Sequence, residues 1–126
     1  MSNPPVPAGL IIWTSGDRFD SMATFYRDTL GLVPATFRAE HIAFQQGDFR
    51  LTIGVHDEIS GPSNDSLRVM LNLAVDDIAS SFDRLRNLEV PIIRPPERES
   101  WGGWVATLRD PDGNTVQLLQ LPPESD

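Results

Sequence analysis

The chain has 126 residues, enough for one domain of ordinary size, and a formal net charge of −8 from 18 acidic residues and 10 arginines. This balance excludes the basic surface that nucleic acids require, and the absence of cysteine excludes disulfides, zinc–thiolate sites and a thiol nucleophile. The longest apolar run, Leu10–Trp13, is too short to cross a membrane, and residues 1–9 lack the basic run of a signal peptide, so we expect a cytoplasmic protein.

The first half of the chain predicts a strand, a helix and three further strands. An apolar, β-branched run at residues 9–14 indicates the first strand. Near-helical spacing of apolar residues predicts a helix over 20–30, and Gly31 is a typical stop for it. The three short strands are expected at 33–38, 41–46 and 49–55, with a turn at Gln46-Gly47-Asp48 between the last two.

The second half repeats this order. A strand is predicted at 67–75, then a helix from about 78 to 88 with Asp76-Asp77 offering its N-cap. The helix should bury Ile78, Phe82, Leu85 and Leu88. A strand at 90–94 is expected to end at Pro95-Pro96, and residues 104–109 and 115–121 form a hairpin around the turn at 110–114.

The chain is therefore expected to contain two βαβββ modules, a twofold internal repeat. We expect a single domain over 9–121, divided into module one (9–55), a linker (56–66) and module two (67–121). Residues 1–8 are expected to form a disordered tail, and 122–126 a second tail.

Three motifs resemble one known family. Phe25-Tyr26-Arg27-Asp28-Thr29-Leu30-Gly31-Leu32 resembles its first helix, and Val75-Asp76-Asp77-Ile78 its second strand-to-helix junction. Trp101-Gly102-Gly103 followed by Asp110-Pro111-Asp112-Gly113-Asn114 resembles its closing hairpin. The family is the glyoxalase/bleomycin resistance/dioxygenase (vicinal oxygen chelate) superfamily. The resemblance runs from about Leu10 to Leu121 and implies an α+β fold in which the curled mixed sheets of the two βαβββ modules form a cup.

The resemblance also implies where a metal would bind. Enzymes of the family hold a divalent metal with histidine and glutamate side chains on the first and last strands of each module. Here those positions fall at Ile11, Met70 and Gln117, and at Arg50 or its neighbours Leu51 and Thr52. None of these side chains suits a hard divalent cation, so we predict no metal and no cofactor.

Apolar, aromatic and amide side chains remain to form a pocket. Strand alternation and the family register place Met70 and Asn72 on the concave face, together with Gln117 and Trp13. Trp101 and Trp104 flank two glycines at the mouth of the closing hairpin, where indole rings offer flat stacking surfaces. We therefore predict these ligand-binding residues: Trp13, Met70, Asn72, Trp101, Trp104 and Gln117. Catalytic residues are not assigned.

Two functions stand at this point. The first is a small-molecule-binding protein that sequesters an antibiotic or metabolite. The acidic charge and the three tryptophans favour this reading, with a cationic or aromatic ligand. The alternative is a glyoxalase-, lyase- or dioxygenase-like enzyme with a displaced metal site, or with metal-free acid–base catalysis through His41 or a carboxylate. His56, by contrast, is interpreted as a solvated loop residue. In either case the resemblance implies a homodimer. From the charge and the short apolar runs, we expect neither nucleic acid nor a membrane as a partner.

Overall fold

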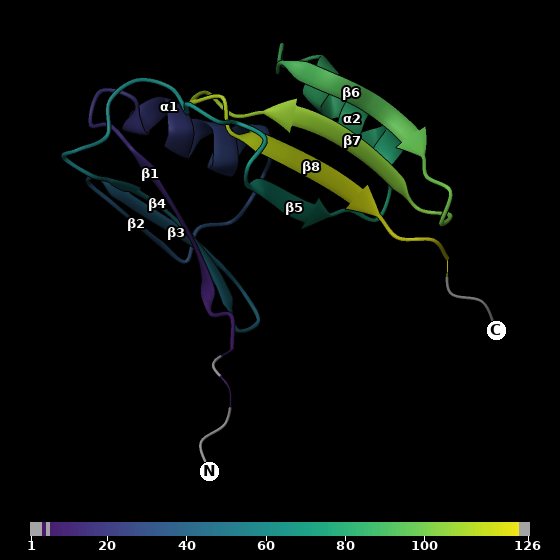
Figure 1. Ribbon diagram of the computed structural model, residues 1–126, viewed down its shortest axis with the longest axis horizontal. Helices are drawn as coiled ribbons and strands as arrows, with labels where there is room; N and C mark the ends of the chain where they lie inside the picture. Colours follow the sequence, from purple (N-terminus) through teal and green to yellow (C-terminus); the bar gives the residue numbers. More distant parts are fainter. Residues whose placement is uncertain (1–3, 5, 124–126) are drawn as a thin grey trace. The chain divides into compact units, whose positions relative to one another are not determined.

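A computed structural model describes residue 4 and residues 6–123 of the chain. The chain divides into two compact units, residues 1–61 and 62–126, and each contains a four-stranded mixed sheet with a helical segment (Figure 1). The α+β class and the repeated βαβββ order are therefore confirmed. The tails predicted at 1–8 and 122–126 fall partly outside the described residues, at 1–3, 5 and 124–126.

The first unit has the strand order β1-β4-β3-β2, in which β1 runs parallel to β4 and the other pairs are antiparallel. Gly47 turns the chain between β3 and β4 with a positive φ of 57°, and both strands have the predicted bounds. The elements are β1 (Gly9–Thr14), α1 (Phe19–Thr24), η1 (Phe25–Thr29), β2 (Thr36–Arg38), β3 (His41–Gln46) and β4 (Phe49–Val55).

The helix predicted over 20–30 is an α-helix that widens into a π-helix. In the π segment η1, the Leu30 amide donates to the Phe25 carbonyl at 2.8 Å, five residues back. A π turn rotates less per residue than an α turn, so the adjacent rings of Phe25 and Tyr26 both become buried. Gly31 stops the helix with a φ of 83°, as expected. The next strand begins later than predicted, at Thr36, because Pro34 lacks an amide to donate.

The second unit has the strand order β5-β8-β7-β6, again with one parallel pair, β5 with β8. Asp77 is the N-cap of α2, since its Oδ1 accepts from the Ser80 amide at 3.3 Å, which confirms the predicted cap. Leu88 is exposed and its predicted place on the buried face is wrong, because the helix ends before it. The elements are β5 (Met70–Ala74), α2 (Ile78–Arg86), β6 (Ile92–Arg98), β7 (Trp104–Arg109) and β8 (Thr115–Gln120).

Pro95-Pro96 does not end the strand that precedes it, contrary to the prediction. Strand β6 continues through both prolines to Arg98, with shifts of register against β7 on either side of Arg94. This is possible because β6 lies at the edge of its sheet, where a missing amide donor breaks no ladder and a bulge absorbs the irregularity.

The hairpin turn after β7 has the predicted chemistry. The buried carboxylate of Asp110 accepts from the amides of Asp112 at 3.0 Å and Asn114 at 2.9 Å, and from the Asn114 side chain at 3.0 Å. Gly113 supplies the positive φ of 84° that the turn requires.

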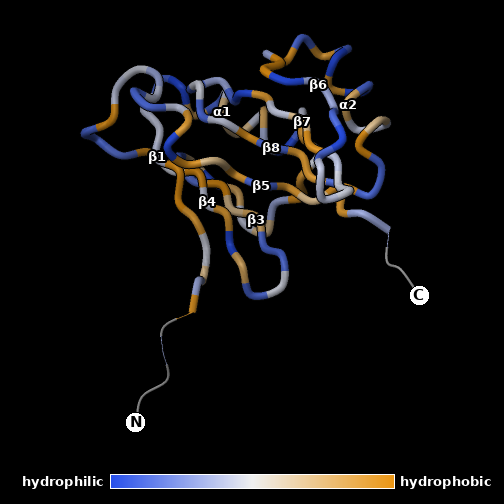
Figure 2. The backbone as a smooth tube through the Cα atoms, turned by 45° about the vertical axis from the view of Figure 1, so that its right-hand side comes forward, coloured by the Kyte–Doolittle hydropathy of each residue, from blue (hydrophilic) through white to orange (hydrophobic). Residues whose placement is uncertain are grey.

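Each sheet has one face toward its helix and one face away from it. In the first unit, the Arg27 guanidinium of η1 lies 4.9 Å from the ring centroid of Phe37, which shares a face with Ile42 and Ile53. In the second unit, the Gln120 side chain accepts from the Ile78 amide of α2 at 2.8 Å. Hydrophobic residues mark much of β1 and β5 along the backbone (Figure 2). We call the two opposite faces the helix-free faces.

Candidate functional site

The helix-free face of the first sheet carries Trp13. Cross-strand pairing aligns Trp13 of β1 with Gly54 of β4 and His41 of β3. A Cβ on Gly54 would lie 3.0 Å from Trp13 Cζ3, so the indole ring extends over this glycine toward the next strand. Trp13 is 45% exposed, which leaves part of an aromatic surface available for stacking.

Two histidines lie near this indole. His56, just past β4, is half-buried and meets the Trp13 ring edge-to-face with the centroids 5.4 Å apart, so it is not the solvated loop residue expected from the sequence. His41 Nε2 is buried and has no hydrogen-bond partner among the described residues. Burial lowers the pKa of His41 below its usual range, and the positive charges of Arg38 and Arg50 lower it further.

Arg50 lies on the same face and is held by neutral groups. Its Nη1 donates to Gln45 Oε1 and its Nη2 to Thr36 Oγ1, each at 3.2 Å. The guanidinium spans from β4 to β2: its cross-strand partner in β3 is Gln45, to which it bonds, and Thr36 of β2 lies opposite the small Ala43. These contacts fix its position without neutralising its charge.

The helix-free face of the second sheet carries two paired amides. Asn72 of β5 and Gln117 of β8 are cross-strand partners, and Gln117 Nε2 donates to Asn72 Oδ1 at 2.7 Å. This bond uses one donor and one acceptor, so the Asn72 amide group and the Gln117 Oε1 keep bonding capacity for another molecule. Met70, two residues before Asn72 on β5, lies on the same face and is the cross-strand partner of Thr115.

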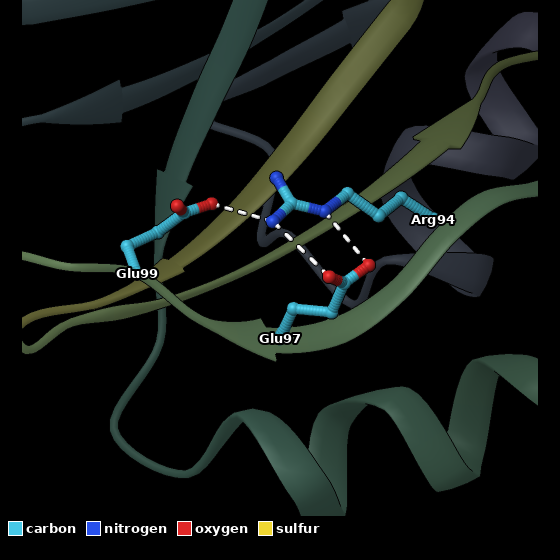
Figure 3. A network of polar contacts seen from close by, with 3 residues as sticks. All are labelled: Arg94, Glu97 and Glu99. Carbon is cyan, nitrogen blue, oxygen red and sulfur yellow. Dashed lines mark hydrogen bonds and ion pairs between the residues drawn. The ribbon is translucent and has the colours of Figure 1, made fainter.

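Arg94 of β6 lies on this second face and pairs with two carboxylates. Its Nε donates to Glu97 Oε1 at 3.0 Å and its Nη2 meets Glu99 Oε1 at 2.7 Å (Figure 3). The hydrogen bond to Glu97 has the largest effect on the pKa of Arg94. Together with the bond to Glu99, it raises this pKa above its usual value. The bulge at Pro95-Pro96 explains the pairing, because it brings positions 94 and 97 of an extended strand to one face.

The other two tryptophans occupy different positions. Trp101 lies in the β6–β7 loop, 52% exposed, and a Cβ on Gly103 would lie 2.0 Å from its ring, so the indole rests directly on that glycine. Trp104 pairs with Gln120 and therefore lies on the helix-facing side of β7. The structure thus groups Met70, Asn72 and Gln117 on one face, places Trp13 on the first sheet, and puts Trp104 on the opposite side from the amide pair.

Sequence reasoning missed the role of Arg50 and Arg94. From the sequence, Arg50 was interpreted only as a residue unable to bind a metal. The period of two along 49–55 already puts it on the same side as Thr52 and Gly54, so this signal was present. The pairing of Arg94 with glutamates was not predicted, because the two prolines after it were expected to end the strand.

The comparisons with known proteins decide the family. Residues 15–118 match the family model described as the Glyoxalase/Bleomycin resistance protein/Dioxygenase superfamily. The chain belongs to this superfamily. It is 32% identical over 111 residues to the bleomycin resistance protein of Klebsiella pneumoniae, covering 81% of this chain and 83% of that protein. It is 28% identical to the uncharacterized protein YraH of Bacillus subtilis, covering 82% of this chain and 90% of that protein.

Solved structures show the same fold. A protein of unknown function from Agrobacterium tumefaciens superposes with a TM-score of 0.76 at 21% identity, over 95% of this chain and 97% of that one. The lactoylglutathione lyase of the same organism superposes with a TM-score of 0.69 at 22% identity, over 94% and 95% of the two chains. No helix within the described residues is long and apolar enough to span a membrane.

The residues at the metal positions of the superfamily do not fit a divalent cation. Met70 offers a thioether and Gln117 a neutral amide that already bonds to Asn72. Ile11 shares its row with Thr52 and Ala43, and the neighbouring row carries the positive charge of Arg50. Nowhere in the described part of the chain do three His, Asp or Glu side chains gather as a metal would require.

Proposed function

We propose that this protein binds a small organic molecule on its helix-free sheet faces and sequesters it without chemical conversion. The observation that carries the proposal is the Asn72–Gln117 amide pair. Gln117 stands at the position where the family resemblance implies a metal ligand, and the pair keeps the Asn72 amide group as a donor and Gln117 Oε1 as an acceptor for a ligand. Hydrogen bonds of this kind orient a bound molecule but supply neither a nucleophile nor a strong acid.

Two further observations support binding. Trp13 and Trp101 both present partly exposed indole faces supported by glycines, Gly54 and Gly103, which suits the stacking of an aromatic ligand. The relative from Klebsiella pneumoniae is named a bleomycin resistance protein, which makes an antibiotic one ligand class to test alongside metabolites.

The test is a thermal-shift screen of antibiotics and metabolites, followed by titration of variants with any compound that stabilises the protein. Gln117→Ala and Trp101→Ala should each weaken binding roughly tenfold, since each removes a hydrogen bond or a stacking surface. Gln46→Ala, an exposed amide at the end of β3, is the matched control and should bind normally. Mass spectrometry that finds a stabilising compound chemically altered would contradict sequestration.

One observation favours the enzymatic alternative. His41 Nε2 is buried without a partner among the described residues, and its lowered pKa keeps the ring neutral near pH 7, as a general base requires. Turnover that is lost in His41→Gln would put metal-free acid–base catalysis ahead of sequestration.

We also propose that the protein binds no metal and that it forms a homodimer. Elemental analysis of the purified protein should find far less than one equivalent of Mn, Fe, Ni or Zn. Pairing of two chains would cover exposed apolar residues of the sheets, such as Ile11 and Met70. Light scattering that gives the chain mass of 14.0 kDa at micromolar concentration would contradict the dimer.

A further inference from the structure

The charge on the helix-free face of the first sheet is opposite to the charge of the whole protein. The strand positions that share this face include Arg38, His41 and Arg50, and no aspartate or glutamate. The net charge of −8 therefore comes from elsewhere on the chain. A ligand meets the local field at short range, since exposed charges beyond about 10 Å are screened by salt.

The two arginines on this face lack the carboxylate partners that four arginines elsewhere have, a property that they share, in the described structure, with Arg98 and Arg109 of the second unit. Arg27, Arg68, Arg86 and Arg94 each form an ion pair with an aspartate or glutamate. Among the described residues, Arg50 bonds only to the neutral oxygens of Gln45 and Thr36, and Arg38 is exposed with no ion pair. A positioned guanidinium without a counter-charge is ready to receive an anion, and its planar fork matches a carboxylate.

A second observation points to a ligand at the same place. His41 lies in the row between Gly54 and Arg38, and its buried Nε2 has no hydrogen-bond partner in the described structure. Buried polar nitrogens are nearly always bonded, so this one marks a position where a partner is missing. The ring of Trp13 extends over Gly54 toward it and supplies a flat apolar surface beside the charged groups.

We infer that the helix-free face of the first sheet binds the carboxylate of a small aromatic acid, with Arg50 and Arg38 holding the anion and Trp13 stacking on the ring. This assignment rests on the proposed small-molecule binding and names the ligand class for it. It differs from the cationic ligand that the total charge favours, because the unpaired charges beside Trp13 are positive. No bond is made or broken, so the site needs no co-reactant.

Three planar isosteres test the charge preference: benzoate, neutral benzamide and cationic benzamidinium. Each is titrated into the full-length protein while the indole N–H resonance of Trp13, assigned with Trp13→Phe, is followed by NMR. Benzoate should shift this resonance and bind at least tenfold more tightly than benzamide, with binding weakened by added salt, and benzamidinium should bind no better than benzamide. Inorganic phosphate is the anion without an aromatic ring and should bind more weakly than benzoate.

Arg50→Gln should reduce benzoate affinity at least tenfold. Arg38→Gln, at an exposed position that does not risk folding, should reduce it severalfold. Arg86→Gln removes the same charge from the surface of α2 and should leave benzoate binding unchanged. Equal or tighter binding of benzamidinium, or full benzoate affinity in both Arg50→Gln and Arg38→Gln, would overturn the inference.

The inference and the proposed function fail in different ways. A cationic compound whose binding depends on Gln117 or Trp101, with no response to benzoate, would retain small-molecule binding and reject the anion site. If benzoate binds as expected but no compound depends on Gln117 or Trp101, the anion site stands and the amide-pair proposal fails.

Discussion

The two sheets share a topology, yet Arg94 and Arg50, one on each helix-free face, have opposite electrostatic surroundings. In the second sheet, Arg94 is neutralised by Glu97 and Glu99, which a proline bulge brings to its side. In the first sheet, Arg50 is positioned by Thr36 and Gln45 and keeps its charge. The repeat therefore fixes the scaffold, while the residues at a few register positions decide whether an arginine is paired with carboxylates or keeps its charge.

We expect the two sheets to be anchored equally to their helices. Ile53 in the first unit and Leu108 in the second are both fully buried on helix-facing sides. Ile53→Ala and Leu108→Ala should each lower the free energy of unfolding by about 2–5 kcal/mol, because each leaves a cavity. Urea denaturation followed by circular dichroism measures this. Val33→Ala, at an exposed position, is the control, and a loss below about 1 kcal/mol in either core variant would contradict the described packing.

The position of Trp101, in the β6–β7 loop of the second unit, depends on Gly103. A Cβ at Gly103 would lie 2.0 Å from the Trp101 ring and 2.9 Å from the Gln120 carbonyl oxygen. Gly103→Ala should therefore displace the indole and lower stability by about 1–3 kcal/mol. Gly16→Ala, where the nearest atom would be 4.0 Å away, should change stability little. Thermal unfolding and the Trp101 indole resonance report the two effects, and an unmoved resonance would refute the contact.

Removing the carboxylates should make the second face resemble the first. The double variant Glu97→Gln/Glu99→Gln frees Arg94 and should raise the affinity of the second sheet for benzoate roughly two- to fivefold, as expected for an exposed charge. Asp83→Asn frees Arg86 on α2 and is the control, with no gain expected. NMR shifts of the Gln117 side-chain amide follow the binding. An unchanged affinity would show that the ion pairs do not account for the difference between the faces.

The smallest effect concerns His41. Its folded-state pKa lies below the unfolded value of 6.5, so the unfolded chain binds more protons as the pH falls through that value. The stability that His41 contributes as a neutral group is therefore present above about pH 6.5 and lost below it. Tm measured from about pH 8 to about pH 5 should fall less in His41→Gln than in the parent protein. Parallel curves would mean that the ring is solvated when folded.

Much of the fold was predictable because it depends on local rules. Period-two alternation and a glycine turn gave β3 and β4 their bounds, and Asp77 was recognised as a helix cap. The errors came where tertiary context overrides local preference. The edge position of β6 tolerates Pro95-Pro96, and the helix that begins at Phe19 widens into a π turn at Phe25.

The candidate site was predictable only in part. Asn72 and Gln117 were placed on one face by alternation alone, and the structure adds that they bond to each other. Trp104 was expected beside them because it flanks the same loop as Trp101, but proximity in sequence does not fix which side of a strand a residue occupies. The pairing of Trp104 with Gln120 does.

The sequence by itself determined the doubled βαβββ order, the family resemblance and the apolar or neutral residues Ile11, Met70 and Gln117 at positions where the family has metal ligands, because these depend on residue type and spacing. Only the tertiary structure decided which charges meet. A bulge in β6 brings Arg94 and Glu97 together, while Arg50 of β4 reaches Thr36 of β2 across β3. Coulomb interactions depend on the distance between the charges in space. Residues that are far apart or irregularly spaced in the chain come close together only when the strands pair in register.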